Sequence, residues 1–440
     1  MTLIPPKPIS IFRNRNFSLL FWGILVSNVA HILFSTAISF YILRIAAASY
    51  GEATATIIQS VYLAVNGIIL LALTPLGGVL ADRWNKTKIM YITDYIRGIT
   101  ILLTGVFILL SDNLLWEIVS LFLMNVILSV NAGIFSPASS SLLRFIVSDE
   151  ELQPGAALLQ GSSSFQSIVG LVLFALLYST VNIFVIFLIN GLAYLISAFS
   201  EMFIRYDHVA PETRITMKVV IKDTKEGLSY LFHQKAIFVL LIMALFVNFF
   251  FNPIFAVGLP NFIEFGLETE TGYLFSGLIS PKVWLSVFEL AFSIAVIIMS
   301  LILSRKATSE NLGKKLKIAL VSITLPVVVL ALGLIGYHND LFSVNTSLIV
   351  ITLAMFALGF ANVAFNVPVS LAMQKKVDRN MLGKVSSVSN VLSMGLVPIS
   401  SLLGGMLIAE FSPSVLYGVC AVGTIIVTAL YVKNKQANEI

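Results

Sequence analysis

Four ionisable side chains lie inside apolar stretches of this sequence, where charge is otherwise rare. Glu289 lies in WLSVFELAFSI, His31 lies in NVAHILF, and Asp94 and Arg97 lie three residues apart in YITDYIRGIT. Carboxyl and imidazole groups can bind and release a proton, and ionisable residues at membrane depth are costly to insert, so they often mark function. We therefore expect Glu289, His31, Asp94 and Arg97 to be candidates for coupling to an ion gradient, with Glu289 the leading one.

Each candidate also has a structural interpretation. His31 can be a neutral histidine bonded to a backbone carbonyl, and Glu289 can form an internal ion pair, for which Lys282 is a distant option two turns away. Asp94 and Arg97 are one helical turn apart and can pair with each other, which favours a structural or gating role over substrate contact.

The composition indicates which elements hold these residues. Of the 440 residues, 58% are hydrophobic and only 11% are charged, whereas soluble domains carry about 25% charged residues. A helix needs roughly 20 apolar residues to cross a bilayer. Twelve such runs are present, near residues 17–43, 54–80, 89–110, 116–142, 153–178, 182–204, 236–262, 281–304, 316–337, 346–373, 382–409 and 413–432.

The longest polar interruption divides the runs into six plus six. We predict an N-terminal half over residues 1–204, a linker with a basic amphipathic helix over 205–235, and a C-terminal half over 236–440. With the N-terminus inside, 24 of the 27 lysines and arginines fall in inner segments, as the positive-inside rule requires. The sequence therefore predicts a multi-pass protein of the bacterial inner membrane with both termini in the cytoplasm.

Two inner connections share an order of residue types. GIFSPASSSLLRFIVSDEELQPGAALLQGSSS starts at Gly133, and AFNVPVSLAMQKKVDRNMLGKVSSVSNVLS starts at Ala364. Each has a proline in an apolar helix, then a basic residue, an aspartate, a leucine, a glycine and serines. Duplication of a six-helix half explains this register, although inner loops of unrelated membrane proteins can also look alike.

The segment GGVLADRWNKTKIM, from Gly77 to Met90, is the most specific motif. It resembles the signature G-x-L-A-D-R-x-G-R-K of the major facilitator superfamily. Asn85 stands in place of the second glycine, and Lys86 stands in place of the last arginine. The resemblance implies an all-α fold of twelve helices in two pseudo-symmetric halves. It also implies that the loop holds the halves together on the cytoplasmic side in the outward-facing state. An ordinary basic loop is the alternative. The gate residues are then Gly78, Asp82, Arg83, Lys86 and Lys88.

Two further segments are similar to one branch of that superfamily. RNRNFSLLFWGILVSNVAHILFSTAISFYIL resembles the opening of macrolide-efflux-like exporters, a branch that includes siderophore exporters, and LGKVSSVSNVLSMGLVPISSLLGGMLIAEF resembles the eleventh helix of the same branch. Drug antiporters of the superfamily often carry an arginine in helix 4, and LFLMNVILSVNAGIF has none. A proton-relay role for that arginine therefore does not carry over to this chain.

Polar, uncharged and aromatic residues inside the apolar runs predict a substrate cavity. A large apolar cavity with a few polar groups suits an amphipathic organic molecule, whereas aromatic residues in membrane helices also serve packing and lipid contact. The candidates are Asn28, Gln59, Asn66, Gln160, Gln166, Asn248, Asn252, Asn362, Asn366, Phe251 and Phe365.

Several other chemistries are disfavoured. The sequence has no G-x-x-x-x-G-K-[ST] loop for ATP and no G-x-S-x-G nucleophile motif, and one cysteine with four scattered histidines offers no cluster of metal ligands. The basic residues occupy short loops, which disfavours nucleic-acid binding. We expect a monomeric, cofactor-free, non-enzymatic transporter that exports an amphipathic drug-like or macrolide-like molecule in exchange for protons. Siderophore or lipid cargo, uptake, and a sensor that transports nothing are the alternatives.

Overall fold

The computed structural model describes residues 11–206, 217–304, 312–378 and 381–434, and the regular elements in these ranges are all helices. Eleven helical stretches are long and apolar enough to cross a membrane. The first helix, α1 (Arg15–Arg83), has 69 residues, a length of about 100 Å, which exceeds the roughly 30 Å of bilayer core several-fold. It bends at Gly51, whose φ of 80° suits glycine. Counted as two crossings, α1 brings the total to the predicted twelve.

The remaining helices match the predicted runs closely. Four follow α1 before the linker: α2 (Lys86–Leu110), α3 (Leu114–Ile146), α4 (Asp149–Leu177) and α5 (Ile183–Met202). The linker contains α6 (Met217–His233). The seventh crossing consists of α7 (Lys235–Pro253), a π-helical turn (Ile254–Gly258), α8 (Leu259–Asn261) and a second π-helical turn (Phe262–Gly266). After it come α9 (Val283–Ser304), α10 (Leu312–His338), α11 (Val344–Lys376), α12 (Leu382–Met394), α13 (Val397–Glu410) and α14 (Pro413–Lys433).

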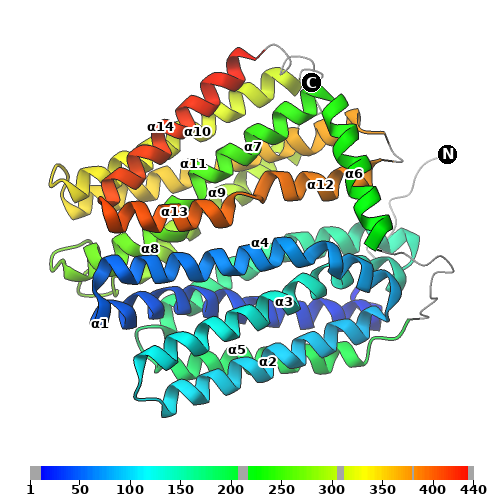
Figure 1. Ribbon diagram of the computed structural model, residues 1–440, viewed down its shortest axis with the longest axis horizontal. Coiled ribbons are helices and arrows are strands. Elements are labelled where there is room, and N and C mark those ends of the chain that lie inside the picture. The colour runs from blue at the N-terminus through cyan, green and yellow to red at the C-terminus, as the bar shows by residue number, and fades with distance from the viewer. Residues whose placement is uncertain (1–10, 207–216, 305–311, 379–380, 435–440) are drawn as a thin grey trace. The chain divides into compact units, whose positions relative to one another are not determined.

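The chain forms two compact units. The first contains Met1–Ser35, Ile69–Leu173 and Val181–Met217, and the second contains Thr36–Ile68, Phe174–Thr180 and Lys218–Ile440. In the first unit, α2 packs against α3 and α5. In the second unit, α10 packs against α11 and α14, and α7 packs against α12, α13 and α14 (Figure 1). The division into residues 1–204, 205–235 and 236–440 stays a prediction.

Helix α2 has the polarity expected of a helix in lipid, with its apolar face outward. Ile96, Leu103 and Leu110 are exposed, whereas Asp94 and Arg97 are buried. Lipid favours exposed aliphatic side chains, and ionisable residues in membrane helices face the protein interior. Its packing against α3 and α5 therefore sets the surroundings of both predicted coupling residues.

The predicted helix of the linker is present as α6, and it runs across the direction of α12 rather than along it (Figure 1). Its buried Leu231 packs with Ile237, Val377 and Val385. The Tyr230 hydroxyl accepts a hydrogen bond from the backbone N–H of Asp378 at 3.1 Å. Helix α6 is thus attached to the second unit at the end of α11 and the start of α12.

The two halves show matching helices, as the fold predicts. Helices α3 and α11 both have 33 residues and carry Pro137 and Pro368 at nearly the same distance from their first residues. The packed pair α2 and α5 has its counterpart in α10 and α14. A hydrogen bond between the buried hydroxyls of Thr324 and Thr428 joins the second pair.

The glycine pair at the end of α1 has two different environments. The carbonyl oxygen of Gly133, on α3, occupies the space that a Cβ at Gly77 would need, whereas a Cβ at Gly78 would meet nothing within 4 Å. Small residues allow helices in lipid to approach closely. Gly77 therefore makes the close helix contact, and Gly78 does not.

Gly77→Ala should destabilise the protein by about 1–3 kcal/mol, the usual cost of overpacking, because the added methyl group collides with backbone. Thermal unfolding of the detergent-solubilised protein measures the loss. Gly78→Ala is the matched control and should leave the midpoint unchanged. Equal losses in both variants would contradict this account of the packing.

Candidate functional site

The signature loop between α1 and α2 is held by its own side chains. The side-chain oxygen of Asn85, Oδ1, accepts a hydrogen bond from the Lys88 N–H at 3.1 Å and caps α2. Arg83 and Lys88 are exposed, as predicted for a surface loop. Lys86 is buried instead: its ammonium donates to the Ala81 carbonyl at 2.9 Å and lies 4.6 Å from the centre of the Phe145 ring. A cation close to the end of α1 complements the orphan carbonyls there. The side chain of Asp82 lies outside the described part of the structure.

The loop is also attached to the segment that follows α5. The Tyr206 hydroxyl accepts a hydrogen bond from the Lys86 N–H at 2.7 Å. Partial burial raises the pKa of Tyr206, while this backbone hydrogen bond opposes the rise. The hydroxyl therefore stays neutral at physiological pH and serves as a fixed acceptor.

A cavity of about 430 Å³ lies in the second unit between α7, α10, α11 and α12. Five of the eleven predicted cavity residues line it, and they come from α7 and α11. They are Asn248, Phe251, Asn362, Phe365 and Asn366.

Two amides of this cavity are fixed by hydrogen bonds. Asn248 donates to the Ser393 carbonyl at 3.0 Å, and Asn366 donates to the Asn362 side-chain oxygen at 3.1 Å. The Phe251 ring packs at 4.2 Å, centre to centre, on Phe255. The arrangement offers apolar contact area and a few oriented amides, which is the surface that an uncharged or amphipathic molecule requires.

The other predicted cavity residues do not line this cavity. Asn28 donates to Gln166 at 3.2 Å in the first unit, and Gln59 donates to Ser39 in the second. Asn252 accepts a hydrogen bond from Ser401 at 2.9 Å. The remaining two are exposed: Asn66 and Gln160.

The predicted Asp94–Arg97 pair is present, and a second carboxyl group lies close to it. Arg97 donates to Asp94 Oδ1 at 3.0 Å. Its guanidinium lies over the Phe135 and Tyr194 rings, at 4.7 and 5.4 Å from their centres. Glu201, on α5, is fully buried and interacts electrostatically with both Asp94 and Arg97.

Close approach of α2 and α5 brings these groups together. Gly98 and Gly191 face each other, and the carbonyl of each lies where a Cβ on the other would point. On α5, Tyr194, Ser197 and Glu201 follow at helical spacing and are all buried. The α5 face opposite Asp94 and Arg97 is therefore polar.

The two other coupling candidates have different surroundings. The His31 side chain is exposed, and its ring meets the edge of Tyr194 at 6.3 Å. Glu289 is partly buried on α9. The suggested ion pair between Glu289 and Lys282 is wrong, because Lys282 binds Glu264 and Glu268 at 3.4 and 3.1 Å.

This Lys282 cluster joins several parts of the second unit. The ammonium of Lys282 lies 5.6 Å from the centre of the Tyr178 ring, and Arg44 lies over the same ring at 6.0 Å. Ser179 and Ser280 share a hydrogen bond of 2.8 Å beside it. Residues from α1, from the connection after α4 and from the seventh crossing thus meet at one charged cluster.

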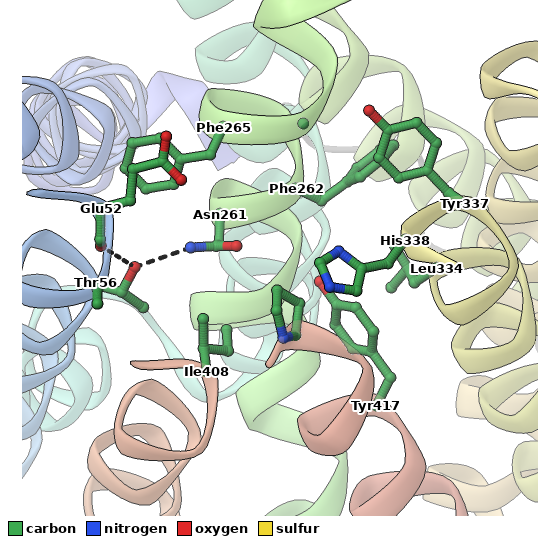
Figure 2. A pocket seen from close by; sticks show the side chains of 13 residues that line it. Glu52, Thr56, Asn261, Phe262, Phe265, Leu334, Tyr337, His338, Ile408 and Tyr417 are labelled. Carbon is green, nitrogen blue, oxygen red and sulfur yellow. Dashed lines mark hydrogen bonds between the residues drawn. The ribbon is translucent and has the colours of Figure 1, made fainter. Parts of the chain in front are cut away.

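A second cavity, of about 260 Å³, lies in the same unit (Figure 2). Glu52 and Thr56 of α1 border it on one side, and Asn261 donates to the Thr56 hydroxyl at 2.8 Å. Figure 2 shows Tyr337 and His338 across the cavity from them. The α1 hairpin is therefore hydrogen-bonded to the seventh crossing at this end.

Sequence reasoning missed Glu201 and Asn261. Glu201 lies near the end of the run 182–204, where a charge suggests a boundary, and only its i+7 spacing from Tyr194 indicates a buried face. Asn261 likewise lies at the end of the run 236–262. The sequence feature that could have identified both residues is their position as polar residues at the ends of predicted spans.

The sequence profile of the Major Facilitator Superfamily matches residues 20–399. The chain belongs to the Major Facilitator Superfamily. The family is one of transporters, and the chain is accordingly a multi-pass membrane protein of this family. The predicted family is therefore confirmed.

Curated relatives include exporters. The chain is 27% identical to a putative bacilysin exporter of Bacillus amyloliquefaciens, over 65% of this chain and 79% of that protein. It is 25% identical to macrolide efflux protein A of Enterococcus faecalis, over 42% and 56%. An uncharacterized transporter of Bacillus subtilis, YkuC, is 28% identical over 59% of each chain. The matches thus span little more than half the length of several of these relatives.

Solved structures share the fold across nearly the whole chain. A peptide transporter POT in complex with alafosfalin matches with a TM-score of 0.70 at 14% identity, over 95% of this chain and 94% of that one. A bacterial homologue of the iron transporter ferroportin, in an inward-facing state, matches with a TM-score of 0.69 at 13% identity, over 95% and 98%. These similarities confirm the predicted fold.

The two carboxylates around Lys282 should differ in their contribution to stability. The Glu264 side chain is 6% exposed and that of Glu268 is 45% exposed. Glu264→Gln should cost roughly 3 kcal/mol, because it leaves a buried charge less compensated. Glu268→Gln should cost about 0–1 kcal/mol, as for a surface pair. Thermal unfolding of both variants in detergent tests the order, and a larger loss for Glu268→Gln would contradict it.

Proposed function

We propose that this protein is a proton-coupled exporter of amphipathic small molecules, working by alternating access in the bacterial inner membrane. The observation that carries the proposal is the cavity lined by Asn248, Phe251, Asn362, Phe365 and Asn366. The named efflux proteins among the relatives support export over uptake. The cargo would be drug-like or macrolide-like, the chain monomeric, and no cofactor would be needed.

The cavity's lining favours this class of cargo. Aromatic and aliphatic side chains make up most of its wall, and the polar groups are neutral amides and hydroxyls. Such a surface would hold an apolar body and orient a few hydrogen-bonding groups. The described lining of the cavity contains no cationic residue that could pair with a strongly anionic ligand.

Proton coupling is supported by the ionisable groups at membrane depth. Glu289 lies on α9 among apolar neighbours, and no ion pair to it occurs within the described residues. His31 and the Asp94–Arg97 pair are the further candidates. A carboxyl group that alternates between water and an apolar setting would take up a proton in one conformation and lose it in the other.

The predicted topology supports one gate on the cytoplasmic side of the membrane and a second gate on the opposite side. Lysines and arginines concentrate in the segments predicted to be cytoplasmic, which places the signature loop, with Arg83 and Lys88, on that side. Thr56, Asn261 and the Lys282 cluster then belong to the opposite side. We propose that breaking these contacts accompanies outward opening.

Substrate-dependent proton movement in proteoliposomes tests the coupling. Macrolides, dyes and siderophores are added to vesicles containing the wild type, and flux should fall at least tenfold in Glu289→Gln because the variant cannot carry a proton. His31→Gln is measured in parallel. Glu410→Gln, at the exposed end of α13, is the matched control and should behave as the wild type. Unchanged flux in Glu289→Gln and His31→Gln would reject both coupling sites. Absence of flux with every compound would count against the exporter.

Binding of the same compounds tests the cavity. Phe251→Ala removes a ring from its wall and should weaken binding of the transported compound by about 1–3 kcal/mol, the scale of a large buried apolar contact. Phe246→Ala changes an exposed ring on the same helix and is the control. Titration of purified protein by intrinsic fluorescence gives both affinities, and equal weakening would argue that the cavity is not the site.

A further inference from the structure

The cluster between α2 and α5 contains more negative than positive groups. Asp94 and Glu201 both have 0% exposure, and Arg97 forms its ion pair with Asp94 while interacting electrostatically with Glu201. The other groups that face the cluster are the Tyr194 phenol and the Ser197 hydroxyl on α5, the Phe135 ring on α3, and the exposed His31 imidazole on α1. The cluster therefore holds two carboxyl groups and one guanidinium, and the guanidinium is paired with Asp94 only.

Hydrogen bonds satisfy only half of each carboxyl group. Arg97 binds Asp94 Oδ1 at 3.0 Å, and Ser197 donates to Glu201 Oε1 at 3.5 Å. Asp94 Oδ2 and Glu201 Oε2 are buried and find no hydrogen-bond partner within the described residues. An ionised carboxylate oxygen in this position lacks the hydrogen bonds that it would normally accept. A protonated carboxyl group accepts fewer hydrogen bonds and can donate one of its own.

Electrostatics also favours protonation of one of the two carboxyl groups. A buried charge without a partner costs far more than a paired one, so such groups neutralise instead. Two ionised carboxylates beside one guanidinium would leave a net charge of about −1 out of water. Uptake of one proton removes that charge and leaves a single ion pair.

We propose that Asp94 and Glu201 form a binding site for a single proton, with Arg97 as the cation that stabilises the carboxylate left ionised, Asp94 being its partner in this structure. The inference rests on the proposed function, because it adds this pair to Glu289 as a second site on the path of the transported proton. Glu201 becomes a coupling residue, and Arg97 a positioning residue. On loading, an O–H bond forms on one carboxylate; on release, that bond breaks and the proton leaves to water, with no other reactant involved.

The site also has the features that a release step requires. Rings cover the guanidinium at 4.7 and 5.4 Å, which excludes water from the loaded pair. The pair depends on the approach of α2 and α5 at Gly98 and Gly191. Separation of the two helices or entry of water would stabilise the second charge and discharge the proton.

Infrared spectroscopy of the protein in lipid tests the site without transport. A protonated carboxyl group has a carbonyl stretch distinct from that of a carboxylate, and the wild type should show such a band near neutral pH. Glu201→Gln should lose it, because Asp94 then pairs alone with Arg97, and Asp94→Asn should lose it for the matching reason. Glu289→Gln is the control and should keep the band of the pair. A wild type without the band, or a band that survives both substitutions, overturns the proposal.

Proton flux in proteoliposomes provides the second readout. Glu201→Gln should lower flux at least tenfold while thermal unfolding and substrate binding show a folded protein. Asp94→Glu, which keeps the carboxyl group, should recover part of the flux. A folded Glu201→Gln with full flux overturns the proposal. A band that responds as expected in a wild type without flux would reject the exporter and retain the proton site.

Discussion

Lipid cannot solvate charge, so every charged group at membrane depth needs a partner from the protein itself. Three basic residues lie outside the segments predicted to be cytoplasmic, and each illustrates the constraint. Arg97 pairs with Asp94, Lys282 pairs with two glutamates, and Arg44 lies over the rings of Tyr41 and Tyr178. Each of the three basic residues outside the segments predicted to be cytoplasmic thus has a partner within the protein.

Helix packing answers the same constraint. Because lipid provides no hydrophobic driving force between helices, close backbone approach and polar contact hold them together. Gly77 with Gly133, and Gly98 with Gly191, provide such approaches. The second contact has a further effect, since it places the polar face of α5 opposite Asp94 and Arg97. Packing and ionisable chemistry therefore depend on the same few positions.

The fold was readable from the sequence because each crossing is a long apolar run, and lipid thickness fixes its length. Five of the eleven predicted cavity residues line the cavity, because Asn248 and Phe251 share a face of α7, and Asn362, Phe365 and Asn366 share a face of α11. Partners across helices were not readable. Periodicity indicates which face is polar but not which helix it meets, so Glu201 was missed. The burial of Lys86, whose side chain turns back onto α1, was likewise not predicted.

The matched helix pairs of the two halves differ in their chemistry. The pair α2 and α5 contains the Asp94–Arg97 ion pair of α2 and the buried Glu201 of α5, whereas a hydrogen bond between Thr324 and Thr428 joins α10 to α14. Both pairs consist of packed helices, but hydroxyl groups are buried in one pair and ionisable groups in the other. A scaffold whose two halves match in their helices is therefore chemically one-sided, because a proton can be taken up by the buried groups of one half and not by the hydroxyls at the matching place in the other.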